Sequence, residues 1–193
     1  MNLWFRLIGL LFSRPWRSKV TNKDHVAVIK LRVWPTDLDL NRHVTNGRYF
    51  AFGDIARIDF ALKTGTHKVA WKHKATAVVG DTWGKFRKEL KLFEAFEIHT
   101  KIIGWDEKWF YFKHYFVRNE RIVGVVVVRG LFKTRSYTVP PQEFFRELGF
   151  DDTPPEKGEW LEHWSKSCDL MSEEIREFEN SDNINYLNKE NNT

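Results

Sequence analysis

Hydrophobic residues change their spacing near residue 36, and this change separates a strand pattern from a helix pattern. Residues 25–34 (HVAVIKLRVW) alternate between apolar and polar side chains, which is typical of a half-buried strand. Residues 46–63 carry apolar side chains around most of a helical circumference, so we predict a long, buried helix. Asn46 is placed to cap this helix, and Thr64 and Gly65 are suited to end it.

Beyond this helix the sequence has mainly strand character, in the stretches 74–80, 83–92, 95–105, 109–118 and 121–134. Turn-like residues at 106–108 and 119–120 separate the last three, which predicts antiparallel hairpins. Residues 122–128 (IVGVVVV) are apolar on both faces, as in a central strand covered on both sides. A strand, a long helix and then an antiparallel meander predict an α+β fold in which a curved sheet wraps one helix.

The two ends of the chain differ from this central region. Residues 142–150 and roughly 156–179 have the pattern of appended helices, and the last residues are polar without periodicity. We therefore expect four parts: an N-terminal amphipathic segment over 1–22, one folded domain over 23–139, a helical extension over 140–179 and a disordered tail over 180–193.

The apolar run at the N-terminus has two interpretations. Interrupted by Arg6, it is too short to span a bilayer, which requires ~20 apolar residues. It lacks a small-residue cleavage site, which disfavours a secretory signal peptide. Residues 1–20 have the composition of a helix that lies in a membrane interface, but they could equally pack against the body or a partner subunit.

The formal net charge is +5, and the charged residues are distributed unevenly along the chain. From Asp151 onward the chain has 4 basic and 12 acidic residues, whereas the first 150 residues have 27 basic and 14 acidic residues. A basic body suits nucleic acid, anionic lipid or a phosphorylated carrier such as coenzyme A. The single Cys168 excludes an intrachain disulfide and indicates a reducing compartment. We expect a cytoplasmic protein, with peripheral membrane contact through residues 1–20 left open.

Between the first strand and the helix, residues 36–50 (TDLDLNRHVTNGRYF) concentrate polar side chains. Residues 37–46 (DLDLNRHVTN) resemble the DxDxNxHVNN signature of hotdog-fold acyl thioesterases, carried most fully by the plant acyl-carrier-protein thioesterases. Residues 49–57 (YFAFGDIAR) resemble the YxxFxExAR helix of bacterial acyl-CoA thioesterases related to the 4-hydroxybenzoyl-CoA enzyme. The strand order is similar over about residues 24–135. The aromatic-rich strands and appended termini are also similar to the thioesterase-superfamily-member-six-like group.

This resemblance implies a hotdog fold whose subunits pair their sheets edge to edge, with active sites at the interface of a homodimer or higher oligomer. It implies that Asp39 activates water or attacks the thioester, and the plant motif adds Asn41 and His43. Thr45 departs from that motif, which has an asparagine at this place. The substrate would be an acyl-CoA or acyl-carrier-protein thioester, and no bound cofactor is expected.

The residue chemistry is compatible with this implied site. Thioester hydrolysis requires a base or nucleophile and donors for the developing oxyanion. The backbone N–H groups from Val44 to Gly47 stand at a helix start and could bind the carbonyl oxygen, and Gly47 allows close approach. We therefore place substrate contacts at Val44, Asn46, Gly47 and Tyr49.

Each of these residues also has a structural interpretation. Asp37 is better explained as a loop-ordering residue, Asn46 as the helix cap and Tyr49 as a core residue. Asn41 and His43 could each merely shape the loop. Asp54 and Arg57, three apart on the helix, are spaced to pair electrostatically. Because their helix is predicted to be buried, they could instead face the subunit interface or the acyl slot.

Other functions remain as alternatives. A non-catalytic acyl-binding or membrane-associated scaffold would use the same slot, with Asp39 only ordering the loop. A hotdog dehydratase is disfavoured because no hydratase-type motif is found. Basic and aromatic residues interleave at 83–93 and 108–116, but alternating strands produce the same pattern, so nucleic-acid binding is disfavoured. The seven histidines show no metal-binding spacing, and no metal is expected.

Overall fold

The computed structural model describes residues 2–12, 22–150 and 153–181. The chain divides into two compact units, Met1–Glu156 and Lys157–Thr193. The second unit contains one long helix, α5 (Glu159–Asn180), within its described residues. The four-part division expected from the sequence stays a prediction.

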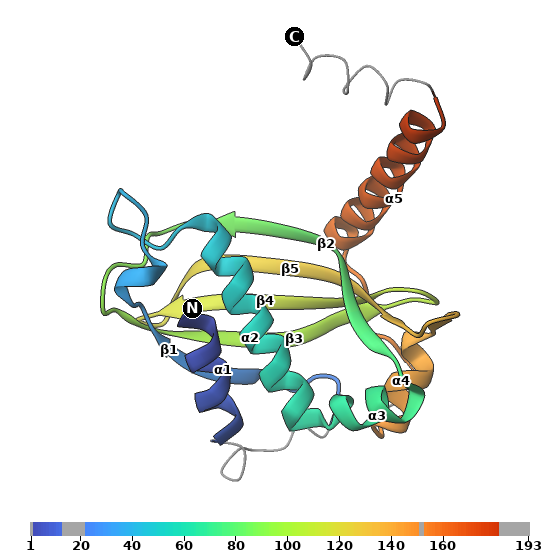
Figure 1. Ribbon diagram of the computed structural model, residues 1–193, viewed down its shortest axis with the longest axis horizontal. Coiled ribbons are helices and arrows are strands. Elements are labelled where there is room, and N and C mark those ends of the chain that lie inside the picture. The colour runs from blue at the N-terminus through green and yellow to red at the C-terminus, as the bar shows by residue number, and fades with distance from the viewer. Residues whose placement is uncertain (1, 13–21, 151–152, 182–193) are drawn as a thin grey trace. The chain divides into compact units, whose positions relative to one another are not determined.

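An antiparallel sheet forms the centre of the first unit (Figure 1). Its strands are β1 (Ala27–Arg32), β2 (Thr76–Phe86), β3 (Ala95–Trp105), β4 (Phe110–Arg118), β5 (Arg121–Lys133) and the short β6 (Thr138–Val139). They are arranged in the order β1-β3-β4-β5-β2, and β6 pairs with β5. The long helix α2 (Asn46–Thr64) crosses one face of this curved sheet, which is the predicted α+β arrangement.

Strand β2 corrects the sequence prediction of two separate strands at 74–80 and 83–92. It runs continuously from Thr76 to Phe86 along β5, with a shift in register between Val79 and Asp81. The turn-like Gly80 lies at this irregularity and is a bulge within the strand rather than a break. A Cβ atom on Gly80 would lie 2.8 Å from the Trp109 ring, so this close approach explains the glycine.

The N-terminal cap of α2 differs from the sequence prediction, whereas its C-terminal end is as predicted. Thr45, and not Asn46, is the N-cap, and its side chain accepts a hydrogen bond from the Arg48 N–H. Gly65 ends the helix in the left-handed conformation at φ 85°. A further short helix, α3 (Thr66–His73), follows at once and was missed because its eight residues lack an apolar period of their own.

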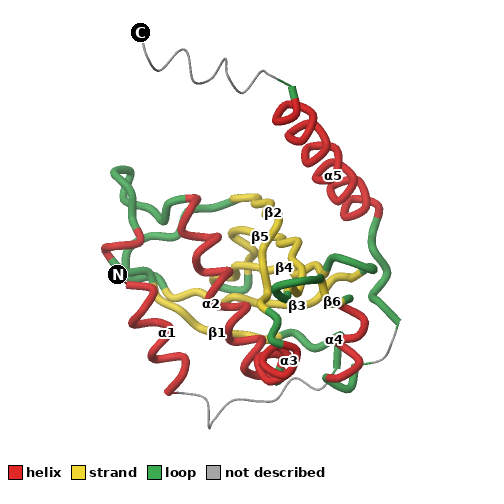
Figure 2. The backbone as a smooth tube through the Cα atoms, turned by 45° about the vertical axis from the view of Figure 1, so that its right-hand side comes forward, coloured by secondary structure: helices red, strands yellow, loops and turns green. Residues whose placement is uncertain are grey.

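The core consists of two clusters that meet beneath α2. The first lies under the N-terminal half of the helix and includes Tyr49, Phe52, Phe96 and Phe116. The second lies toward α3 and α4 (Pro141–Glu147), which are neighbours at one end of the sheet in Figure 2. This second cluster is dominated by aromatic rings: Phe60, Trp105, Phe110, Phe112, Phe132, Phe144, Phe145 and Phe150.

The N-terminal segment forms a helix, α1 (Asn2–Phe12), and this helix packs on the body. Leu10 is buried in the first core cluster and Leu7 packs against it. Trp4, Phe5 and Phe12 are instead 69%, 74% and 77% exposed. Packing on the body, one of the two interpretations offered by the sequence, is therefore correct for one side of the helix. Among the described residues, none of the helices is both long enough and apolar enough to span a membrane.

Candidate functional site

Asp37 orders the polar loop between β1 and α2 from inside. It ends a short 3-10 helix, η2 (Pro35–Asp37), and its side chain is fully buried. Its Oδ2 accepts hydrogen bonds from the Trp34 N–H at 2.8 Å and from Arg6 at 2.6 Å, and its Oδ1 lies 3.2 Å from Arg48 Nε. Asp37 thus has the loop-ordering role predicted for it, with an arginine from α1 that sequence spacing could not reveal.

Asp39 stands on the outer part of the same loop. Its Oδ1 accepts hydrogen bonds from the backbone N–H of Asn41 at 2.9 Å and of His43 at 3.5 Å. The backbone closes a turn here, because the Arg42 N–H donates to the Asp39 carbonyl, and Arg42 adopts a positive φ of 63°. The carboxylate is therefore held by the backbone of its own turn while its side chain remains 28% exposed.

The other two motif residues have different relations to Asp39. His43 Nδ1 lies 3.4 Å from both Asp39 Oδ2 and the Val44 carbonyl oxygen. Two acceptors near one nitrogen favour a proton on Nδ1, which leaves Nε2 as the acceptor of the neutral ring. The Asn41 side chain is exposed to solvent, while its N–H binds Asp39. The structure thus brings His43 to Asp39 and leaves the Asn41 amide facing solvent.

Two backbone N–H groups are open at the start of α2. The Val44 N–H donates to Leu90 and the Thr45 N–H to Asp37, so neither is available to a ligand. Within the part of the chain that the structure describes, the N–H groups of Asn46 and Gly47 meet no acceptor, and both residues are exposed. These two donors at a helix start are therefore the ones suited to bind an oxyanion.

Val44 and Tyr49, the remaining predicted contact residues, lie in the core with 3% and 2% exposure. The Tyr49 hydroxyl donates to the Lys88 carbonyl oxygen at 3.4 Å. Burial raises the pKa of Tyr49 to about 12, so the phenol stays neutral at physiological pH. The structure brings neither side chain to the surface.

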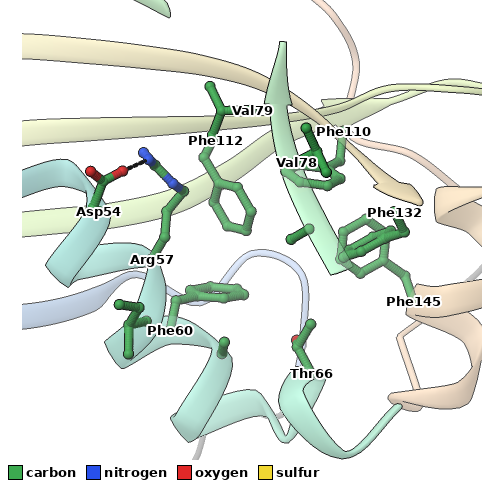
Figure 3. Close-up of a pocket in the computed structure, with 13 residues that line it drawn as sticks. Asp54, Arg57, Phe60, Thr66, Val78, Val79, Phe110, Phe112, Phe132 and Phe145 are labelled. Atoms are coloured by element: carbon green, nitrogen blue, oxygen red, sulfur yellow. Dashed lines mark hydrogen bonds and ion pairs between the residues drawn. The ribbon is translucent and has the colours of Figure 1, made fainter. Parts of the chain in front are cut away.

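A cavity of about 350 Å³ opens beside the C-terminal half of α2 (Figure 3). Its walls are almost entirely apolar and come from α2, α3, α4, β2, β4 and β5: Ile58, Phe60, Ala61, Thr66, Ala77, Val78, Val79, Phe110, Phe112, Phe132 and Phe145. Among the residues that the structure describes, Asp54 and Arg57 are the only charged ones that line it. Asp39, Asn41 and His43 do not line this cavity.

Arg57, His114 and Thr100 form a chain of polar contacts that runs from the cavity into the core. Arg57 forms an ion pair with Asp54, as the sequence spacing predicted, and its Nη1 lies 3.2 Å from His114 Nε2. His114 Nδ1 lies 2.9 Å from Thr100 Oγ1. Because a guanidinium only donates, Nε2 is the acceptor and Nδ1 carries the proton that Thr100 accepts. His114 was not predicted from the sequence, although it interrupts the inward-facing aromatic residues Phe110, Phe112 and Phe116 of β4.

His73, Glu143 and Glu147 form a surface cluster in which one donor atom from each lies within 4.8 Å of the others. Glu147 is bound by Lys72 Nζ at 2.8 Å and by His73 Nε2 at 2.5 Å. These contacts lower the pKa of the Glu147 carboxyl, with the hydrogen bond from Lys72 as the largest cause. The cluster is an exposed ion-pair network, and it has no connection to the cavity.

A curved antiparallel sheet around one long helix, with a polar loop at the start of that helix, is the arrangement of hotdog-fold thioesterases. The sequence model of the thioesterase-like superfamily matches residues 33–149, and the chain belongs to this superfamily. The match covers the loop, α2 and the whole meander, and it begins after α1.

Individual relatives agree with this assignment. Protein THEM6 of Danio rerio is 31% identical, over 91% of this chain and 87% of that protein. Thioesterase lcsJ of Purpureocillium lilacinum is 25% identical, over 67% of this chain and 50% of that protein. A crystal structure of a 4-hydroxybenzoyl CoA thioesterase mutant complexed with 4-hydroxybenzoyl CoA has a TM-score of 0.58 at 16% identity, covering 64% of this chain and 97% of that chain. This last likeness confirms the predicted hotdog fold.

Proposed function

We propose that this protein hydrolyses acyl thioesters, with Asp39 as general base or nucleophile. Membership of the thioesterase-like superfamily supports the reaction class. The observation that carries the assignment of Asp39 is its position: a partly exposed carboxylate, fixed by the N–H groups of its own turn, on the loop that leads into the open first turn of α2.

The reaction would proceed as follows at this site. The thioester carbonyl oxygen would accept hydrogen bonds from the N–H groups of Asn46 and Gly47, where the helix start favours negative charge. Asp39 would either take a proton from the attacking water or add to the carbonyl carbon itself. When water attacks, the C–S bond then breaks, the thiolate leaves and takes up the proton held by Asp39, and the acid is released. When Asp39 attacks, the same C–S cleavage leaves the acyl group on Asp39 as an anhydride, which a water molecule hydrolyses to release the acid and restore the carboxylate. His43 Nε2 is suited to hold the water as an acceptor.

Several finer features belong to the same proposal. The acyl group would occupy the apolar cavity beside α2, which is lined by aromatic rings. Coenzyme A or acyl carrier protein would carry the acyl group. The active form would be a homodimer or higher homo-oligomer in the cytoplasm, with membrane contact through α1. A non-catalytic acyl-binding scaffold is the alternative, in which Asp39 only orders its turn.

Thiol release from acyl-CoAs of graded chain length tests the proposal. We expect Asp39→Asn to lower kcat/KM by at least ~100-fold, because the amide can neither accept the proton nor attack, while the fold is retained. Asp24→Asn, at an exposed aspartate outside the loop, is the matched control and should keep the activity of the wild type. Equal activity in both variants would show that another residue is the base or nucleophile, and inactivity of the wild type on every thioester would favour the scaffold.

A further inference from the structure

Arg57 is placed where an acyl group in the cavity would meet a fixed, charged hydrogen-bond donor. Figure 3 shows Asp54 and Arg57 at one end of the cavity and Phe132 and Phe145 at the other. The Arg57 side chain is 15% exposed, whereas that of Asp54 is 63% exposed. The guanidinium therefore lies between the apolar cavity and the solvent, and the Asp54 carboxylate lies on its solvent side.

The guanidinium is immobilised from two sides. His114, which is fully buried, accepts from Nη1 on the inner side, and Asp54 binds Nη2 on the outer side. His114 is in turn fixed by Thr100, its direct neighbour across β3 and β4. These contacts use only part of the five N–H donors that an arginine carries. The remaining donors can bind a ligand without any reorganisation of the side chain.

A buried charged chain of this kind is a poor way to stabilise a core. Replacing buried ionic groups with apolar residues of similar volume is often neutral or stabilising. Gly53 lies directly against this chain, since a Cβ atom there would be in ordinary van der Waals contact with Arg57 Nη1 at 3.4 Å and with His114 Cδ2 at 3.5 Å. An apolar cavity with one preorganised polar group is instead the usual form of a specific ligand site.

Arg57 lies well along α2 from Asn46 and Gly47, where the thioester group is proposed to bind. Arg57 follows Asn46 by eleven residues, which at helical rise corresponds to about 16 Å. Its side chain leans toward the helix N-terminus, which shortens this distance somewhat. With the thioester at Asn46 and Gly47, as the proposed function has it, the acyl chain reaches Arg57 partway along its length and continues past it toward Phe132 and Phe145.

We propose that Arg57 selects acyl chains that carry a hydroxyl or keto oxygen partway along the chain, remote from the thioester. A neutral oxygen suits this position better than a carboxylate, because Asp54 already balances the charge of Arg57. An unsubstituted chain would leave the guanidinium donors without an acceptor when it displaces water from the cavity, and sites of this type reject such analogues strongly. The inference rests on the proposed function for the location of the thioester.

Binding of non-hydrolysable thioether analogues of acyl-CoA tests the inference without requiring hydrolysis. Two series are compared by isothermal titration calorimetry on the full chain: unsubstituted chains, and chains of equal length with one hydroxyl moved stepwise along them. We expect the hydroxyl to improve Kd by about tenfold or more at one position well beyond the carbonyl. Arg57→Met should remove this preference, and Arg57→Lys should reduce it because the planar fork is lost. Arg121→Met, at an exposed arginine outside the cavity, should retain it.

The outcomes separate the inference from the proposed function. A hydroxyl preference without any thioester hydrolysis would support the inference and contradict the proposed function. In the wild type, equal binding of both series or binding of neither series would overturn the inference, and this comparison does not depend on the folding of any variant. An equal loss for both series in folded Arg57→Met would also overturn it, since Arg57 would then contact a part of the ligand that both series share.

Discussion

At the level of a single residue, the environment of His114 keeps its imidazole ring neutral. Burial lowers the pKa of its imidazole well below the usual value, and the nearby positive charge of Arg57 lowers it further. The neutral ring with its proton on Nδ1 is the form that both neighbours require, since Nε2 accepts from Arg57 and Nδ1 donates to Thr100. Protonation would place two positive charges side by side in the core.

The stability of the protein should therefore depend on pH through His114. Because its folded pKa lies below the unfolded value of about 6.5, the unfolded chain binds a proton that the native state does not. The contribution of His114 is present above pH 6.5 and is lost as pH falls below it, at about 1.4 kcal/mol per pH unit until the folded pKa is reached. Urea unfolding at several pH values, for the wild type and His114→Gln, should show their difference in stability shrinking from pH 7 to 5.

His163→Gln provides the control for this measurement, because His163 is exposed on α5. Its difference from the wild type should stay constant over the same pH range. A constant difference for His114→Gln as well would show that the buried histidine titrates normally.

At the level of elements, the close approach of three strands depends on a single missing side chain. A Cβ atom on Gly130 of β5 would lie 2.6 Å from the Phe110 ring and 2.9 Å from the Val78 carbonyl oxygen. The backbone oxygen belongs to the paired strand β2 and cannot move away without breaking the ladder. Gly130 is therefore a packing requirement of the wall of the cavity.

We expect Gly130→Ala to lower the free energy of unfolding by about 1 to 3 kcal/mol through overpacking. Chemical denaturation monitored by tryptophan fluorescence measures this change. Gly158→Ala is the control for steric contact, since a Cβ atom there meets nothing within 4 Å, and its effect should be smaller and limited to the loss of a favourable N-cap residue at the start of α5. Equal stability of both variants would mean that β2 and β5 adjust more easily than their pairing indicates.

The helix α1 joins the loop on one side and presents aromatic residues on the other. Arg6 reaches Asp37 and also lies 4.9 Å from the centre of the Phe52 ring. The exposed Trp4 and Phe5 are the residue types that insert into a membrane interface.

We therefore expect the protein to bind anionic lipid vesicles through α1. The double variant Trp4→Ser and Phe5→Ser should lose most of this binding in a vesicle sedimentation assay, because the apolar area that enters the interface is removed. Trp71→Ser with Phe93→Ser, which changes two other exposed aromatic residues, should bind as the wild type does. Loss of binding in the second variant alone would place the membrane contact elsewhere.

For the whole molecule, the edge strand β2, one of the two at the ends of the sheet, is the feature that bears on assembly. Strand β2 pairs with β5 on one side, and within the described residues no strand covers its other side. Val78 and Val79 on this strand are 40% and 41% exposed and also line the cavity. A long, partly apolar edge strand presents unpaired backbone N–H and C=O groups with which another chain can form a sheet.

Light scattering coupled to size-exclusion chromatography should give a mass of about twice the 23.1 kDa of the chain, or a higher multiple. Pairing of β2 with β2 of a second copy about a two-fold axis would give hydrogen-bond partners to the outer-edge backbone groups of this strand in both subunits. A monomer at micromolar concentration would contradict the proposed homo-oligomer and would leave the cavity open to solvent beside β2.

The sequence by itself determined the succession of one strand, a long helix and an antiparallel meander, the hotdog class and the location of the polar loop, because hydrophobic period and the motif around Asp39 are local properties of the chain. It also predicted the pairing of Asp54 with Arg57, since three residues on a helix bring side chains together. Only the tertiary structure decided that His114 and Thr100 extend this pair into the core, that Arg6 binds Asp37 across 31 positions and that Val44 is buried. These relations depend on strand register and helix packing, which join residues far apart in the chain and leave no periodic signal in the sequence.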